Sequence, residues 1–244
     1  MAAEVLRNSN LASAVLAFLP VCDLEKSLHT CKHFKACAFE AFKVQARFQK
    51  EISLEQLWAY RIFMIERLGK KDASYTEILD RMIQVKSVTI NSVDAPHFAF
   101  LEGALEEMLL SKAMSSLTSL SITTVVADHS VTNHDLQDIV KTCGKLRRLE
   151  IHRFESEKAP QIHLLSDEGM KELPCLDQLQ SISIHNAPAI THKTLEIFAQ
   201  MPALTFVRLS KCTITKQDVI SFCAMTADRH VTFDDTVVTV PDLI

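Results

Sequence analysis

From residue 85 onward, one pattern of hydrophobic and polar positions recurs along the chain. Five seven-residue segments carry an aliphatic residue at their first, fourth and sixth positions: VKSVTIN (85–91), LTSLSIT (117–123), LRRLEIH (146–152), LQSISIH (179–185) and LTFVRLS (204–210). A sixth segment, DRHVTFD (228–234), keeps only Val231 and Phe233 of this pattern. Because side chains alternate along a strand, the fourth and sixth residues lie on the same face. Each segment is therefore predicted to form a short strand with one buried face.

Helix-like stretches separate these predicted strands. Candidate N-caps precede them: Ser166, Thr191, Thr132 or Asn133, and Thr215, which forms a capping-box pattern with Asp218. The stretch from Asp94 to Ser115 is predicted to be a longer helix. The strand segments start 24 to 33 residues apart. Strands and helices alternating at this period indicate a solenoid, in which stacked neighbours bury one another's apolar faces.

The chain before the repeats has a different pattern. Residues 10–42 are predicted to be helical with a break at Pro20, and Asp23 can cap the second helix. Ser53 and Ser74 can cap two further helices before the first repeat. The pattern thus divides the chain into a helical region (8–48), linker helices that seal the first repeat (49–83), and a repeat solenoid (84–244).

Composition and charge narrow the possible functions. The net charge of −4 gives no general attraction to nucleic acid or to an anionic membrane, and only four glycines are present, without a phosphate-binding loop. Seven cysteines without CxxC spacing, and no Asn-x-Ser/Thr sequon, favour the cytoplasm or nucleus. Residues 11–22 are apolar like a signal peptide, but Glu4 and the lack of a small-residue cleavage site argue against one. No apolar run reaches the roughly 18 residues that a membrane span needs.

The repeat pattern resembles leucine-rich repeats. One copy fills every position of L-x-x-L-x-L-x-x-N/C-x-L, with Leu204, Val207, Leu209, Cys212 and Ile214. The run that follows is similar to the cysteine-containing subfamily. The resemblance implies an α/β solenoid of about five or six repeats, in which Cys212 lies at the turn after its strand.

The helical region resembles an F-box. An apolar helix containing Val15, Leu16, Phe18 and Leu19 is followed by Pro20-x-x-Asp23-Leu24 and then by Cys31-Lys32-x-Phe34, where the family usually has Cys-Lys-x-Trp. Arg7–Asn10 stand where F-boxes usually begin Leu-Pro-x-Glu. The fold expected for the whole chain is therefore an α/β leucine-rich-repeat solenoid preceded by a small all-helical F-box-like region.

The two resemblances together imply the substrate-recognition subunit of an SCF-type cullin ubiquitin ligase. The F-box would dock a Skp-type adaptor on the cullin, and the repeats would bind an unidentified target protein, without catalytic residues or a cofactor. The residues expected to contact the adaptor, or to form the F-box core, are Leu11, Val15, Leu16, Leu19, Pro20, Leu24 and Phe34. Two alternatives remain: a repeat scaffold without ligase attachment, and a secreted repeat receptor.

The target is expected on the concave face of the solenoid, where the third, fifth and seventh residues of each strand point. The first two predicted strands offer serine, threonine and asparagine there. The later strands offer Arg148, Glu150, His152, His185, Phe206, Arg208 and His230. Arginine and aromatic residues are enriched at interface hot spots. The same positions also fit a merely solvated sheet face.

Other candidate chemistry is weaker. His29, His33 and Cys37 are spaced four apart and could face a metal ion, but no fourth ligand is evident and a solvated helix face fits them better. No catalytic motif accompanies the cysteines and histidines, and buried cysteines usually behave as small hydrophobic residues. Neither a metal site nor a nucleophilic active site is therefore predicted.

Overall fold

The computed structural model describes residues 37, 41, 49–68, 73–82, 84–91, 103–124, 131–154, 165–226, 229–234 and 236–238. Within these residues the strands form one eight-stranded sheet in chain order. The strands are β1 (Glu51–Ser53), β2 (Ser87–Asn91), β3 (Ser119–Thr124), β4 (Arg148–Arg153), β5 (Ser181–His185), β6 (Phe206–Ser210), β7 (His230–Phe233) and β8 (Thr236–Val238). Strands β1 to β7 are parallel, and β8 pairs antiparallel with β7.

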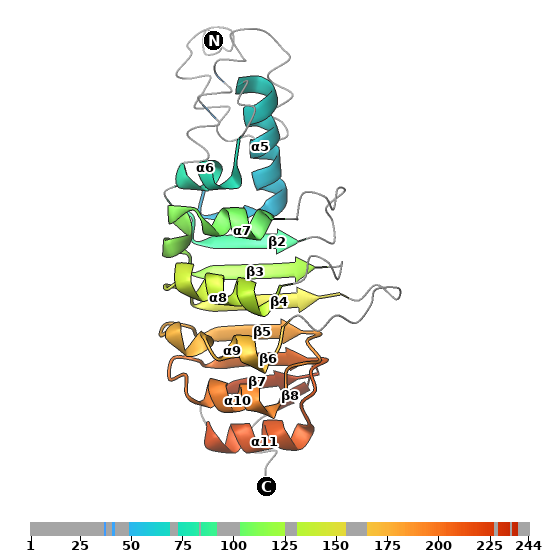
Figure 1. Ribbon diagram of the computed structural model, residues 1–244. Helices are drawn as coiled ribbons and strands as arrows, with labels where there is room; N and C mark the ends of the chain where they lie inside the picture. Colours follow the sequence, from blue (N-terminus) through green and yellow to red (C-terminus); the bar gives the residue numbers. More distant parts are fainter. Residues whose placement is uncertain are drawn as a thin grey trace, which may run out of the picture.

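A helical segment follows nearly every parallel strand. These segments are α5 (Leu54–Leu68), α6 (Tyr75–Asp80), α7 (Ala104–Leu109), η2 (Lys112–Ser116), α8 (Asn133–Thr142), α9 (Asp167–Met170), η4 (Leu173–Cys175), α10 (His192–Ala199) and α11 (Lys216–Met225). Figure 1 shows the strands stacked one below another, with α7 to α11 lying along one face of the sheet. Helix α5 stands across the direction of the others, beside the first strands.

The core lies between the sheet and these helices, at the positions that the repeat pattern predicts. The first, fourth and sixth residues of each complete repeat segment are buried, for example Leu179, Ile182 and Ile184. Helix residues such as Leu195 and Phe198 pack against them in the same hydrophobic cluster. Because each strand contributes aliphatic side chains at the same register positions, the core runs continuously through the stack. The prediction of strands alternating with helices in an α/β solenoid is confirmed for the described residues.

The predicted N-caps mostly act as such. Thr132 and Thr215 each form a complete capping box with the aspartate three residues later. Ser53 and Gln56 bond each other's backbone N–H at the start of α5, and Ser74 caps α6. These side chains satisfy amide groups that a helix leaves open at its first turn. The short polar residues between the repeats therefore fix where each helix begins.

Three elements differ from the prediction. Strand β1 extends the parallel sheet by one strand, although only Ile52 and Leu54 match the repeat pattern there. Strand β8 adds an antiparallel strand at the other end of the sheet, which the repeat pattern did not predict. In the described part of the stretch from Asp94 to Ser115, α7 and η2 are separate, because Ser111 is extended and its hydroxyl bonds Asp80 of α6. The helical stretch expected here is therefore present in the described part, but it is interrupted at Ser111.

Polar side chains also join neighbouring repeats on the helix side. Asn133 at the start of α8 bonds both the backbone N–H and the hydroxyl of Ser166, at 3.0 and 2.9 Å. Ser166 stands at the N-cap of α9, but its side chain makes no capping bond and serves this junction instead. Arg229, just before β7, donates to carbonyl groups at the end of α10, including that of Met201 at 2.8 Å. Each of these sets of hydrogen bonds couples one repeat to the next.

The F-box-like residues, including all seven expected adaptor contacts, lie outside the described part of the chain, apart from two positions. Cys37 and Ala41 are helical and buried, and they belong to the same hydrophobic cluster as the solenoid core. Among the described helices, none has the length and apolar character needed to span a bilayer.

Candidate protein-binding face

Parallel pairing brings the seven residues predicted for the concave face onto four adjacent strands, β4 to β7. Their Cα register forms three rows: Arg148, Ser181, Phe206 and His230; Glu150, Ser183, Arg208 and Thr232; and His152, His185 and Ser210. Neighbouring strands lie about 4.8 Å apart, so side chains in one row are within reach of each other. The strand-face cluster is defined here as Arg148, Glu150, His152, His185, Phe206, Arg208 and His230.

The cluster is accessible at the surface. Arg148, Arg208 and His230 are exposed, and the other four members are partly exposed. The rings of Phe206 and His230 stack at 5.3 Å between centroids, with an interplanar angle of 18°. Such a pair forms a flat aromatic surface that another ring or an aliphatic chain can cover. The first row therefore presents an arginine at one side and an aromatic surface at the other.

The third row contains two neighbouring histidines. The rings of His152 and His185 lie 6.1 Å apart. His152 Nε2 is 3.0 Å from the hydroxyl of Ser183, and His185 Nδ1 is 3.1 Å from that of Ser210. Both serines are buried by their neighbours, at 6% and 5% exposed. The buried hydroxyl groups thus hold both rings in place.

Electrostatics favour the neutral form of one of these histidines. Burial lowers the pKa of His152, and the nearby charge of Arg208 lowers it further, whereas Glu150 acts in the opposite direction. Both charged side chains therefore act on the imidazole through space. At neutral pH the uncharged form of His152 is favoured.

Phe154 is a member of this surface that the sequence pattern did not single out. It follows β4 directly, its side chain is 47% exposed, and its ring lies 5.8 Å from that of His185. Leucine-rich repeats place Asn or Cys at this position. The signal available in the sequence was a large aromatic residue at a position where the repeat pattern has asparagine or cysteine. The third row of the cluster therefore ends in a second aromatic surface.

Cys212 occupies the equivalent slot after β6 and has a structural role. Its thiol packs against the core and lies 3.6 Å from the carbonyl oxygen of Ser210, to which it can donate. Burial raises the pKa of Cys212 to about 11. Because the thiolate is the reactive form of cysteine, this side chain is poorly suited to nucleophilic chemistry.

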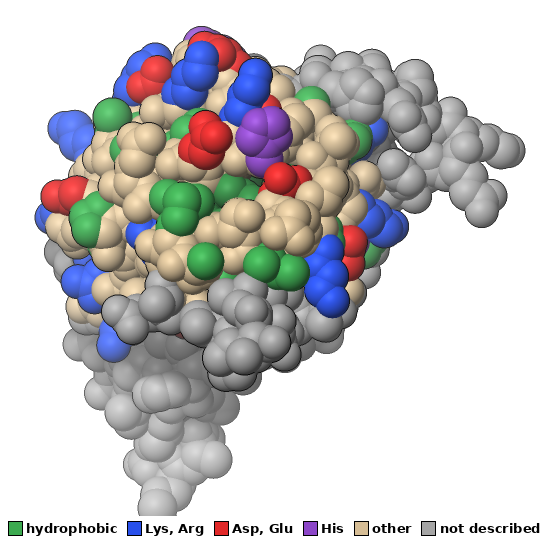
Figure 2. All heavy atoms as spheres, turned by 90° about the horizontal axis from the view of Figure 1, so that it is seen from below, with side chains coloured by type: hydrophobic (Ala, Val, Ile, Leu, Met, Phe, Trp, Pro, Cys, Tyr) green, Lys and Arg blue, Asp and Glu red, His purple; other side chains and the backbone are tan. Residues whose placement is uncertain are grey.

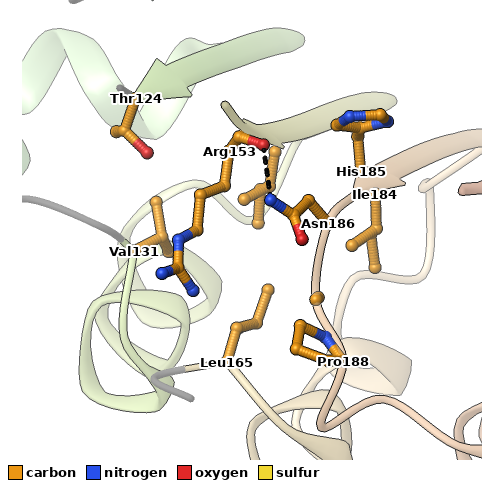
Figure 3. A pocket seen from close by; sticks show the side chains of 10 residues that line it. Thr124, Val131, Arg153, Leu165, Ile184, His185, Asn186 and Pro188 are labelled. Carbon is orange, nitrogen blue, oxygen red and sulfur yellow. Dashed lines mark hydrogen bonds between the residues drawn. The ribbon is translucent and has the colours of Figure 1, made fainter. Parts of the chain in front are cut away.

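A small hollow lies beside the cluster, between the ends of the strands and the loops that follow them. Figure 3 shows Val131, Leu165, Ile184 and Pro188 around it, with Asn186 donating from its side chain to the carbonyl oxygen of Arg153 at 3.2 Å. Its volume of about 20 Å³ suits roughly one water molecule. The hollow is therefore too small for an organic ligand, and the chemistry of this region lies on the open sheet face.

The remaining described surface carries less distinctive chemistry. Strands β2 and β3 present only hydroxyl and amide side chains at the equivalent positions. Figure 2 looks onto the C-terminal end, where hydrophobic side chains form separate small patches among charged ones. No group of three or more metal-ligating side chains gathers within the described residues. Of the three residues considered as metal ligands from the sequence, His29 and His33 lie outside the described residues, and Cys37 is buried.

The strand register decides the fold type. Each repeat segment pairs in parallel with the next at identical pattern positions, and helical segments connect them on one face. The fold is α/β, with parallel strands that alternate with helices as in leucine-rich repeats.

No family model matches this chain, and no curated protein does. Two internalin structures from Listeria monocytogenes are similar to it. Internalin C2 shares 12% sequence identity at a TM-score of 0.44, over 88% of this chain and 92% of its own. InlF shares 13% identity at a TM-score of 0.28, over 79% of this chain and 69% of its own.

Proposed function

We propose that this chain is a non-catalytic protein-recognition subunit that holds a target protein on the strand-face cluster. The observation that carries this proposal is the concentration of two arginines, three histidines and Phe206 on β4 to β7, whereas β2 and β3 present only small polar side chains on the same face. Binding energy at protein interfaces is concentrated in a few such arginine and aromatic anchors. A surface supported by a continuous rigid core presents them in a fixed geometry.

We further propose that the target is delivered to a cullin ubiquitin ligase through the N-terminal region. This step rests on the F-box resemblance of residues 10–42, in which Leu16 and Leu24 would contact a Skp-type adaptor or support the segment that does. Burial of Cys37 and Ala41 in the solenoid core supports a firm connection between the two regions. Free thiols at Cys143 and Cys175 fit the cytoplasm or nucleus, where such ligases work.

In this mechanism the chain acts by tethering. The adaptor would hold one end, the target would lie on the strand face, and the effective concentration of target near the ubiquitin-loaded enzyme would rise. No side chain of this protein would take part in bond formation. The alternative function is a leucine-rich-repeat scaffold that binds its target in the same way without ligase attachment.

Target capture tests the first part of the proposal. Arg148→Glu combined with Phe206→Ala should abolish recovery of the proteins that co-purify with the wild type from cells, because both anchors of the first row are lost. Lys145→Glu with Lys216→Glu alters exposed residues outside the cluster and should retain those partners. Thermal unfolding followed by circular dichroism should be the same for all three proteins. Unchanged recovery with the cluster variant would contradict the proposed binding face.

Co-purification with a Skp-type adaptor and cullin tests the second part. Wild type should recover both, and Leu16→Asp with Leu24→Asp should recover neither while still capturing the target. If wild type recovers the target but no adaptor, the scaffold function replaces the ligase function.

A further inference from the structure

The side chains of the cluster are arranged around two small residues on its central strand. Ser181 and Ser183 of β5 lie between the long side chains of β4, including Arg148, and those of β6, including Phe206 and Arg208. The Cα atoms of Arg148 and Phe206 are separated by two strand spacings, or about 10 Å. An extended partner segment can therefore lie over the partly exposed Ser181 and contact side chains on both neighbouring strands.

The charge of the cluster is opposite to that of the whole protein. The chain has a net charge of −4, whereas the cluster carries two arginines and one carboxylate, Glu150. Asp234, at the turn after β7, accepts a hydrogen bond from the backbone N–H of Lys211 at 2.9 Å and lies at the margin. The local excess of positive charge favours an acidic partner, and complementary charge also accelerates encounter.

We propose that the strand-face cluster binds an extended acidic segment of its partner, with a carboxylate at Arg148 or Arg208 and an aromatic side chain on the stacked rings of Phe206 and His230. This inference rests on the proposed protein-binding function and specifies the partner's chemistry. An extended chain rises about 3.3 Å per residue, so the acid and the aromatic residue are about two to four positions apart.

Protonation of His152 is coupled to this binding. The groups facing its ring are Glu150 on its own strand, His185 on β5 and Arg208 beyond it, while β3 contributes only the uncharged Thr123. A carboxylate that binds at Arg208, whose charge acts on the His152 ring, favours the imidazolium form and so raises its pKa. Binding therefore takes up protons, and the affinity increases as the pH falls from about 7.5 to 6.

Synthetic copolymers of defined composition provide the probes. Fluorescence anisotropy should detect binding of the full chain to labelled poly(Glu,Tyr), weaker binding to poly-Glu and none to poly(Lys,Tyr). Arg148→Glu with Arg208→Glu should weaken poly(Glu,Tyr) binding about tenfold or more. The matched reversals Lys145→Glu with Lys216→Glu change the net charge equally and should leave the affinity unchanged. Phe206→Ala should remove the preference for poly(Glu,Tyr) over poly-Glu, and His152→Gln should reduce the pH dependence.

The outcomes separate this inference from the proposed function. If both double reversals weakened binding equally, the polymer would be attracted by net charge alone, and the acidic-segment assignment would be wrong. Preference for poly(Lys,Tyr), or no binding to either anionic polymer, would overturn the assignment as well. If the inference fails in this way while Arg148→Glu with Phe206→Ala still abolishes target capture, the face binds a protein of different chemistry. If target capture also survives, the proposed function fails as well.

Discussion

Asp167 joins two repeats through a single carboxylate. It accepts hydrogen bonds from the backbone N–H and hydroxyl of Thr191, at 2.8 and 2.7 Å, and from the hydroxyl of Thr194 at 2.6 Å. Burial alone would raise the pKa of Asp167, but these hydrogen bonds outweigh it and the pKa is lowered. The folded protein therefore favours the ionised carboxylate, which connects the start of α9 to the start of α10.

Replacing this carboxylate tests how much its hydrogen bonds contribute to the stability of the folded protein. Asp167→Asn keeps the shape but removes the charge and one acceptor position, and we expect the free energy of unfolding at pH 7 to fall by about 1–3 kcal/mol. Since the pKa is lowered in the folded state, this contribution is complete above the ordinary value of 3.8 and is lost as the pH falls through the folded value. Urea denaturation curves of the two proteins should therefore converge in acid.

Asp138→Asn is the matched control. Asp138 pairs only on the surface of α8 in the described structure, with Lys141 at 3.1 Å and His134 at 3.5 Å. Exposed pairs of this kind contribute about 0–1 kcal/mol. An equal loss at both positions would show that the junction hydrogen bonds add no special stability.

Sequence patterns could place Asp167 in a helix but could not reveal its partners. Thr191 lies 24 residues away, and only the stacked repeats bring the two together. The outward positions of Arg148 and Phe206 were predictable, because alternation along a strand is local. Stacking of Phe206 on His230 follows from the register between strands, which the pattern also supplied. Phe154 lies beyond the strand end, where alternation no longer applies, so only its unusual size at the Asn or Cys position of the repeat could draw attention to it.

At the scale of elements, the junction between α8 and α9 depends on a glycine. A Cβ atom at Gly169 would lie 2.5 Å from the side-chain oxygen of Asn133 and 3.2 Å from its Cα. Asn133 is the residue that bonds Ser166 across this junction. Because glycine has no side chain, the two helices can approach closely enough at Gly169 for the hydrogen bonds between Asn133 and Ser166 to form.

Gly169→Ala should consequently destabilise the protein. The added methyl group must displace Asn133 or separate the helices, and we expect a loss of about 1–3 kcal/mol in urea denaturation, typical of overpacking. Gly144→Ala is the control, because no atom lies within 4 Å of its added Cβ. It should be neutral or slightly stabilising. A neutral Gly169→Ala would indicate that the helices separate without cost.

Elements were predictable where the repeat pattern was complete. Five segments with three aliphatic positions became β2 to β6, and their register followed from the same positions. Strand β1 was missed because Gln49 replaces the first aliphatic residue. Strand β8 was missed because it is antiparallel and lies outside the repeat. The break before η2 depends on Asp80, a residue of the preceding repeat.

The described part of the molecule is a linear stack of repeats. The main contacts between elements join neighbouring repeats, and the hydrophobic cluster passes through the stack from the first strands to β7. In such a solenoid, stability is approximately a sum of repeat and nearest-neighbour interface contributions. Weakening one junction should therefore release the shorter side of the stack before the remainder.

The junction between α6 and η2 offers a test near the N-terminal end. One oxygen of Asp80 accepts hydrogen bonds from the hydroxyl of Ser111 at 2.6 Å and the backbone N–H of Lys112 at 2.9 Å. Asp80→Ala leaves both donors without this acceptor, so native-state hydrogen exchange should accelerate in residues 51–82 and change little in β5 and β6. Asp167→Ala, placed in the middle of the stack, should instead accelerate exchange in the repeats on both sides of α9. If both variants accelerated hydrogen exchange uniformly along the chain, the stack would open only as a whole. The interfaces between repeats would then be stronger than the repeats themselves.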